Sequence, residues 1–249
     1  MKRKIVANTL LSLGMILALA AVLPIKLNSA PKAQSPTLRF RLVDVGTFGG
    51  PNGGYFDTVG ARSLNNRGMV TGTADTSIAV SPPFCFNDCF LEHAFLWQNG
   101  VLTDLGGLPG VTISTSGSND INAKGVVAGL AFTGPVDPVA DFPEFDAVVW
   151  KDGQIIDLGT FGGTFSYANA INNQDQAVGF ALNTTPDSFD LGDVCENFPM
   201  PTQMRAFIWH NGVKQDLGTL GGTDSCALYV NERGQAAGHQ PMLATPPLA

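Results

Sequence analysis

From Thr37 almost to the C-terminus, the chain consists of short runs in which apolar and polar residues alternate. In the first run, Leu38, Phe40 and Leu42 fall on one face and arginines lie between them. A period of two is typical of a strand with one buried face, so we expect a strand over Leu38–Gly46. Further runs come in sets of four, separated by Gly, Asn and Asp residues that favour turns. The strands expected from them are 61–65, 69–73, 93–97 and 101–105; 118–122, 126–129, 146–150 and 154–158; 168–172, 177–179, 205–209 and 213–217; and finally 227–231, with a partner that ends near Gly238.

One stretch recurs four times, at the end of the first run and of each full set. It begins with Asp-Val-Gly or Asp-Leu-Gly and starts at Asp44, Asp104, Asp157 and Asp216, which are 60, 53 and 59 residues apart. A period of this size indicates a repeat architecture. Each Asp is expected to accept hydrogen bonds from main-chain N–H groups in a turn. We therefore expect a single repeat domain over residues 37–249, with repeats that start near 44, 104, 157 and 216.

Two kinds of turn join the expected strands. An Asn-Gly or Asp-Gly pair follows the third strand of each set and fits a type I′ hairpin, in which both central residues have positive φ. The turn after the first strand contains glycine in three repeats and Asp175 in the other, and Asp is among the few side chains that tolerate this conformation. The pairs are Asn99-Gly100, Asp152-Gly153 and Asn211-Gly212, and the glycines are Gly68, Gly125 and Gly234.

Four short antiparallel strands per repeat fit the blade of a β-propeller better than a helical solenoid. The expected fold class is therefore all-β, a β-propeller-like domain of four-stranded antiparallel blades. Residues 227–238 correspond to the first two strands of a blade, and Leu38–Gly46 corresponds to a fourth strand. If the two ends share one blade, they close a ring of four and leave no open sheet edge. The alternative is a fragment of a larger ring.

These motifs resemble those of the HAF family of bacterial extracellular repeat proteins. The resemblance rests on the Asp-Leu-Gly-Thr-Leu/Phe-Gly-Gly run, on the Ile-Asn-x-x-Gly-x-x-x-Gly run and on His93–Trp97, and it covers about Asp44 to Gly238. It implies secretion and a repeat fold, but brings no established chemistry or catalytic residues. The His-Ala-Phe triplet is complete only once, because Asp146 and Arg205 replace its histidine in the next two repeats. This replacement argues against a catalytic ring of histidines.

The N-terminus has the pattern of a secretory signal peptide. A basic start, Met1–Lys4, precedes a mostly apolar stretch over Ile5–Leu23. Such a segment is removed on export or is retained as a membrane anchor. We expect residues 1–30 to be a signal peptide or anchor, and residues 31–36 to be a linker. The protein is then extracellular, on the cell surface or periplasmic, and contacts a membrane only through an uncleaved N-terminal segment.

The body of the chain is acidic. The full sequence has 14 basic and 21 acidic residues, and four of the basic ones lie within the first 30 residues, which leaves the remainder at a net charge of −11. A body of this charge repels phosphate backbones, so nucleic acid is not expected as a partner.

Each repeat has an insertion between its second and third strands, over residues 74–92, 130–145 and 181–204. Variable loops on a rigid scaffold are a usual place for binding, and insertions at the same strand junction gather on one rim. Carboxylates in the second and third insertions are the candidate binding residues, and calcium is the cation that such oxygen ligands would suit. A solvated acidic loop explains the same residues, and no metal or other cofactor is required. The candidates are Asp141, Glu144, Asp187, Asp190 and Asp193.

Four cysteines in an exported chain indicate disulfides, for which three pairings exist. The short spacing favours Cys85 with Cys89, which leaves Cys195 to pair with Cys226.

The function expected from the sequence is a non-catalytic binding module for an extracellular glycan or protein. No Gly-x-Ser-x-Gly, His-Glu-x-x-His or phosphate-binding loop is present. The alternative is a propeller-type glycoside hydrolase or lyase that uses two carboxylates on the rim.

Overall fold

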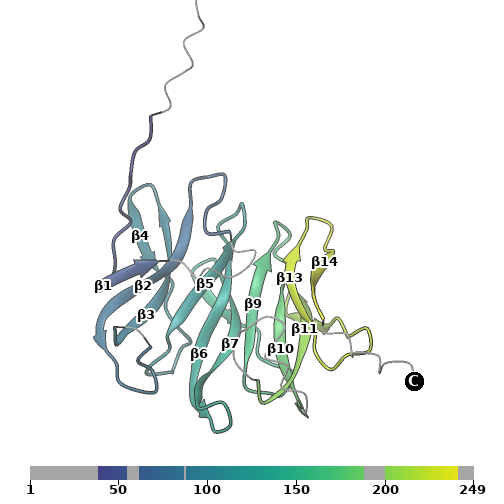
Figure 1. Ribbon diagram of the computed structural model, residues 1–249. Coiled ribbons are helices and arrows are strands. Elements are labelled where there is room, and N and C mark those ends of the chain that lie inside the picture. The colour runs from purple at the N-terminus through teal and green to yellow at the C-terminus, as the bar shows by residue number, and fades with distance from the viewer. Residues whose placement is uncertain (1–38, 55–61, 87, 188–199, 241–249) are drawn as a thin grey trace, which may run out of the picture. The chain divides into compact units, whose positions relative to one another are not determined.

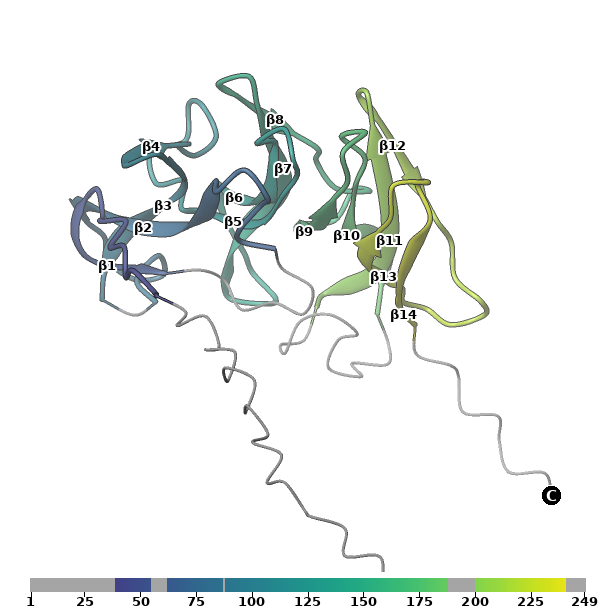
Figure 2. The same cartoon turned by 90° about the horizontal axis from the view of Figure 1, so that it is seen from above.

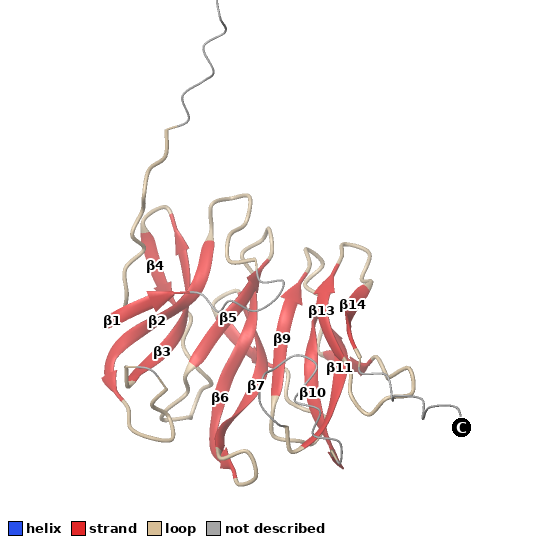
Figure 3. Cartoon of the chain, in the orientation of Figure 1, coloured by secondary structure: helices blue, strands red, loops and turns tan. Residues whose placement is uncertain are grey.

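The computed structural model describes residues 39–54, 62–86, 88–187 and 200–240. The chain divides into two units, and the larger one, residues 43–249, contains all of the strands among the described residues. Strands are the only regular elements in the described residues (Figure 3). The expected signal peptide and linker lie outside the described residues. Within the described ranges, no helix has the length and hydropathy needed to cross a bilayer.

The strands form three four-stranded sheets and one two-stranded hairpin, all antiparallel (Figure 1). We call them the first, second and third sheets and the C-terminal hairpin. The first sheet contains β1(Gly49–Gly54), β2(Val70–Ala79), β3(Phe90–Gln98) and β4(Val101–Asp104). The second contains β5(Ser116–Ile121), β6(Val127–Asp137), β7(Phe142–Lys151) and β8(Gln154–Asp157), and the third contains β9(Ser166–Ile171), β10(Ala177–Pro186), β11(Thr202–His210) and β12(Val213–Asp216). The hairpin consists of β13(Cys226–Val230) and β14(Ala236–His239).

This arrangement confirms the all-β class and the antiparallel repeats, and the strands of the second and third sets lie where the sequence predicts them. Their insertions are more regular than expected, because the second and third strands continue into them. In the second sheet, β6 runs to Asp137 and β7 begins at Phe142, which leaves a four-residue turn.

The predicted strand over Leu38–Gly46 is wrong. Residues 39–46 lie outside any strand, and Phe40 and Leu42 are 90% and 97% exposed. A fourth strand needs a third strand beside it to bond with. In the described part of the chain, β13 and β14 pair only with each other. The blade shared between the two ends is therefore not formed among these residues.

The predicted strand at 61–65 is also wrong, since Arg62 and Leu64 form only isolated bridges. The inner strand of the first sheet is instead β1, in which Gly53 pairs with Ala74. Ser116 pairs with Ala131 in the same way in the second sheet. Glycines allow the close approach of β1 to β2, because a Cβ at Gly50 would overlap the side chain of Asp75.

Successive sheets pack face to face in chain order, as Figure 2 shows from above. The first strand of each sheet lies against the second and third strands of the sheet before it: β5 on β2 and β3, β9 on β6 and β7, and β13 on β10 and β11. Small and large apolar residues interlock at each contact. Between the second and third sheets, for example, Ala128 and Val149 pack in one cluster with Phe207 and Trp209.

A serine link recurs at all three contacts between sheets. Ser166 Oγ donates to the main-chain oxygen of Gly159, at 2.7 Å, and accepts the N–H of Ala147, at 2.8 Å. Ser116 and Ser225 make the same two bonds with Gly106 and Ala94 and with Gly218 and Ala206.

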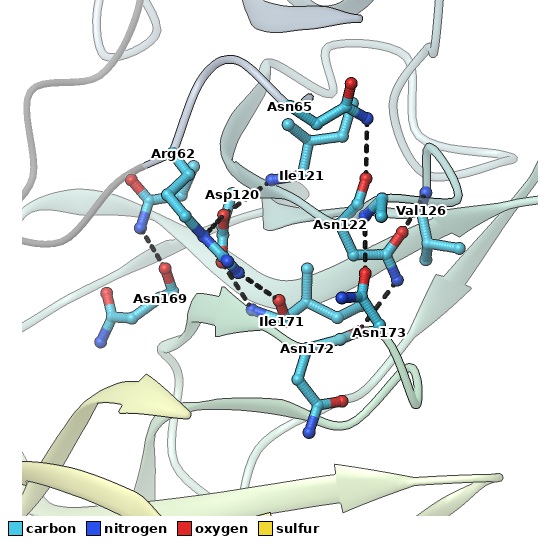
Figure 4. A network of polar contacts seen from close by, with 12 residues as sticks. Arg62, Asn65, Asp120, Ile121, Asn122, Val126, Asn169, Ile171, Asn172 and Asn173 are labelled. Carbon is cyan, nitrogen blue, oxygen red and sulfur yellow. Dashed lines mark hydrogen bonds and ion pairs between the residues drawn. The ribbon is translucent and has the colours of Figure 1, made fainter. Parts of the chain in front are cut away.

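Asparagines form a second link, near the first strands (Figure 4). Asn122 Oδ1 accepts the N–H groups of Lys124 and Val126, which closes its own turn. Its Nδ2 reaches the main-chain oxygen of Asn172, at 3.0 Å. Asn65 donates to Asn122, and Asn172 to Asn231, in the same way at 2.8 Å each. The Ile-Asn-x-x-Gly run thus both turns the chain and joins neighbouring sheets.

The predicted turns are confirmed. Asn99, Asp152 and Asn211 have φ of 52°, 53° and 50°, and each is followed by a glycine with positive φ. Asp175 has φ of 61°. The Asp of each Asp-x-Gly accepts the glycine N–H two residues later, at 2.7–2.9 Å in all four repeats.

Candidate functional site

The ends of the three insertions meet in one aromatic cluster. Phe86 of the first insertion lies 5.1 Å from Phe142 of the second, measured between ring centroids, and Phe142 lies 6.4 Å from Phe165 at the start of β9. Phe84 lies 6.4 Å from Phe132. Met200 of the third insertion packs against the same cluster. The expectation that the insertions gather in one place is thus met by direct contacts.

Part of this cluster is open to solvent. Phe86, which belongs to this cluster, is 46% exposed. Ile78 and Val139 lie at the ends of the first two hairpins, outside the cluster, and are 55% and 77% exposed. Phe84 and Phe142 are half-buried. We call these five residues, together with Asp88, Asp141 and Glu144, which are close to them in sequence, the insertion surface. Large apolar side chains that gather in an exposed patch are typical of an interaction site.

A disulfide braces the first insertion. Cys85 and Cys89 are bonded to each other, and this is the pair that the sequence spacing favours. The bond closes a short loop that carries Phe86, and the Cys89 main-chain oxygen accepts the N–H of Val80. Cys226 is also disulfide-bonded. Its predicted partner, Cys195, lies outside the described residues.

The candidate carboxylates are distributed over two hairpins. Asp141 is exposed in the turn between β6 and β7, with φ of 50°, and Glu144 follows on β7. Burial, and then the charge of Asp137, raise the pKa of Glu144. Asp187 comes directly after β10 on the third insertion. Asp190 and Asp193 lie outside the described residues.

Asp137, in contrast, has a structural role. It is buried, and its Oδ1 accepts the N–H groups of Val139 and Ala140, both at 2.8 Å. Its Oδ2 accepts the hydroxyl of Thr164, at 2.8 Å. These bonds fix the shape of the turn that presents Val139 and Asp141.

A carboxyl pair in the first sheet was not expected from the sequence. Asn52 donates its main-chain N–H to Asp75 Oδ2, at 2.7 Å, and its Nδ2 to Asp88 Oδ2, at 2.6 Å. Burial raises the pKa of Asp75, whereas the Asn52 bond lowers the pKa of Asp88. The neighbouring carboxylate of Asp88 adds to the rise in the pKa of Asp75. Burial, and then the charges of Asp75 and Asp88, raise the pKa of Glu92. The strand pairing shows that Asp75 is unusual, because the equivalent positions in the second and third sheets hold the apolar residues Phe132 and Leu182.

A second carboxyl pair lies at the degenerate histidine position. His93 contacts Asp104 at 3.0 Å in the first sheet, and Arg205 contacts Asp216 at 3.1 Å in the third. In the second sheet the residue that faces Asp157 is Asp146. Burial, and then the charge of Asp157, raise the pKa of Asp146 to about 7. In the sequence, the only indication of this pair is that Asp146 replaces the histidine of the His-Ala-Phe triplet.

Lys214 of the third sheet lies close to this pair. Its Nζ donates to the main-chain oxygens of Gly159 and Thr160, at 2.6 Å and 2.8 Å, and lies 4.6 Å from the ring centroid of Phe161. Burial lowers its pKa to about 8, although the nearby carboxylates oppose the change. The lysine therefore joins two sheets and partly balances the charge of the pair.

A cavity of about 510 Å³ lies at the first sheet, lined among others by Asp44, Asn52, Ser63, Thr71 and Phe95. Within the described ranges, no three His, Cys, Asp or Glu side chains are placed to hold a metal ion.

Comparison with known proteins gives no relative: no family model, no curated protein and no solved structure matches this chain.

Proposed function

We propose that this protein is an exported, non-catalytic binding module that recognises an extracellular glycan or protein through the insertion surface. The sheets would be blades of a β-propeller, with the insertions on one rim. The packing of each sheet on the next in chain order supports this architecture, as do the recurring serine and asparagine links. The basic and apolar N-terminus supports export. The resemblance to the HAF family supports both.

The observation that carries the proposal is the contact between Phe86 and Phe142, at 5.1 Å. It joins insertions from different repeats into one surface, and it leaves Phe86 46% exposed. A loop that served only as a connection would not need a disulfide and two phenylalanines, Phe84 and Phe86, that pack on those of the next insertion. Serine and asparagine hydrogen bonds hold the sheets beneath it together, which favours a preorganised binding surface.

Arrays of extracellular glycans and proteins test this proposal. The purified protein should bind at least one ligand, and F86A combined with V139S should weaken that binding about tenfold, since each change removes exposed apolar area. L220A is the matched control, because Leu220 is 94% exposed outside the insertions. Equal loss of binding in both variants, or an array with no ligand, would reject the insertion surface as the binding site.

A glycoside hydrolase or lyase is the second candidate. It is favoured by the convergence of Asp75 and Asp88 on Asn52, which brings two carboxyl groups to one place. Turnover of an extracellular polysaccharide that disappears in D75N, while binding to the same polysaccharide persists, would establish it. Binding without turnover would leave the first proposal in place.

A further inference from the structure

The insertions have an unusual charge composition. Residues 74–92, 130–145 and 181–204 contain ten of the 21 acidic residues and no Lys, Arg or His. All 14 basic residues and all three histidines therefore lie elsewhere in the chain. The ten acids are Asp75, Asp88, Glu92, Asp137, Asp141, Glu144, Asp187, Asp190, Asp193 and Glu196.

Four of the eleven acidic residues outside the insertions form ion pairs with basic side chains in the described part of the chain. The five ion pairs that the structure shows among the described residues all use carboxylates from outside the insertions, namely Asp104, Asp120, Asp175 and Asp216. Asp175 alone is contacted by two lysines, Lys124 and Lys151. Basic side chains are thus available to carboxylates of the scaffold, whereas the insertions contain no basic side chain of their own.

Aromatic rings and carboxylates alternate on the insertion surface. Phe86 stands two residues before Asp88, and Phe142 stands between Asp141 and Glu144. The rings of Phe86 and Phe142 are 5.1 Å apart and tilted by 33°. An aromatic face attracts a cation, and a carboxylate beside it accepts the hydrogen bonds of a guanidinium or an ammonium group.

We infer that the insertion surface binds an Arg- and Lys-rich extended segment of a partner protein. The inference rests on the proposed function and names the class of its ligand. The occupant follows from charge complementarity together with exposed rings, because such a segment supplies both the cations and the apolar stems that these groups attract. An anionic glycan would be repelled by the same surface. A neutral glycan would use the rings and leave the carboxylates without a role.

Fluorescence anisotropy with labelled octa-arginine tests this inference, with octa-glutamate and maltoheptaose as comparison ligands. Octa-arginine should bind, and its affinity should fall steeply as salt rises from 50 to 300 mM. F86A should weaken binding about two- to fivefold through the lost cation–π contact. D141N combined with E144Q should weaken it by about three- to tenfold.

Two single variants make the matched pair. Asp141 and Asp152 are both exposed turn residues, with φ of 50° and 53°. D141N and D152N therefore make the same chemical and charge change in the same backbone conformation. Only D141N should weaken octa-arginine binding, and the unfolding midpoints of the two variants should agree. Equal weakening by both would assign the attraction to net charge and overturn the inference.

Failure of this inference can be distinguished from failure of the proposed function. If F86A with V139S abolishes binding of a neutral or anionic array ligand, the surface is a binding site and only the cationic class is wrong. If no ligand depends on those residues, the proposed function itself fails.

Discussion

The Nδ2 of Asn122 lies 3.0 Å from the main-chain oxygen of Asn172, so that one amide joins the second sheet to the third. Asn122 is 2% exposed and also bonds to Asp175 and to two N–H groups of its own turn. Replacing Asn122 with alanine leaves several buried polar groups without a hydrogen-bond partner. Each such group lowers the free energy of unfolding by about 1–3 kcal/mol.

N122A should therefore lower the free energy of unfolding by about 2–4 kcal/mol, measured by urea denaturation. N231A is the control. Asn231 is exposed in the C-terminal hairpin and closes its own turn, so its loss should cost about 1 kcal/mol or less. Equal costs would show that the turn, and not the link to the next sheet, is what Asn122 stabilises.

Arg62 and Asp120 form the second pair whose removal we expect to be costly. Arg62 donates to both carboxylate oxygens of Asp120, at 2.9 Å each, and to the main-chain oxygen of Ile171, at 2.6 Å. The Asp120 side chain is fully buried, and burial raises its pKa while Arg62 opposes that rise. R62A should destabilise the fold by about 2–4 kcal/mol, because it leaves a buried charge without its partner.

Adding D120N to R62A should recover part of that loss, since the amide carries no charge to bury. R67A removes an exposed arginine two residues after Asn65 and should change the urea midpoint very little. No recovery in the double variant would mean that Arg62 acts through its bond to Ile171.

Asp146 should make stability fall as pH rises. Its pKa in the folded protein is about 7, above the ordinary value of 3.8. The folded state therefore holds a proton that the unfolded chain releases, and the stabilisation present below about pH 4 is lost between about pH 4 and pH 7. D146N donates an N–H to Asp157 without needing that proton. Its unfolding free energy should depend less on pH in this window.

Urea midpoints at pH 4, 5, 6 and 7 measure the difference. D152N serves as the control, because it removes an exposed carboxylate and should follow the wild-type pH profile. The pKa of Lys214, lowered to about 8, acts above this window and raises stability as pH increases further. Parallel profiles for wild type and D146N would contradict the assignment.

Gly179 should tolerate no side chain. A Cβ there would overlap the main-chain oxygen of Tyr167, and equivalent overlaps occur at Gly72, Gly129 and Gly238. G179A should cost about 2–4 kcal/mol, because strand β9 must move away from β10. At Gly54 an added Cβ meets nothing within 4 Å, so G54A should be close to neutral in thermal unfolding. A mild G179A would show that the pairing of β9 with β10 can shift.

Most of the fold could be predicted because local signals repeat. Asn211-Gly212 requires positive φ at both positions, and Asp216-Leu-Gly closes its own turn through one side-chain bond. Both depend on neighbours in sequence, which a single chain displays. The strand expected at Leu38–Gly46 has the right alternation, but pairing needs a second backbone, and alternation alone does not supply one.

The candidate site was predictable only in part. The insertions and the Cys85–Cys89 pair follow from length and spacing, and the carboxylates on the second insertion were named from composition. The contact between Phe86 and Phe142 joins residues 56 positions apart and depends on how two hairpins lean together. Asp146 was visible in the sequence as a departure from the His-Ala-Phe triplet, whereas Asp75 became visible as a departure only once the register aligned it with Phe132 and Leu182.

The serine link has a consequence for how such a protein lengthens. Ser166 bonds to Ala147 and Gly159 of the preceding repeat, and that repeat reaches its own predecessor through Ser116. A duplicated repeat would therefore contain both the serine that bonds to the preceding repeat and the main-chain groups that bond to the serine of the following repeat. Copying 53–60 residues in frame would add a sheet without any new interface having to evolve, and would free its insertion to diverge.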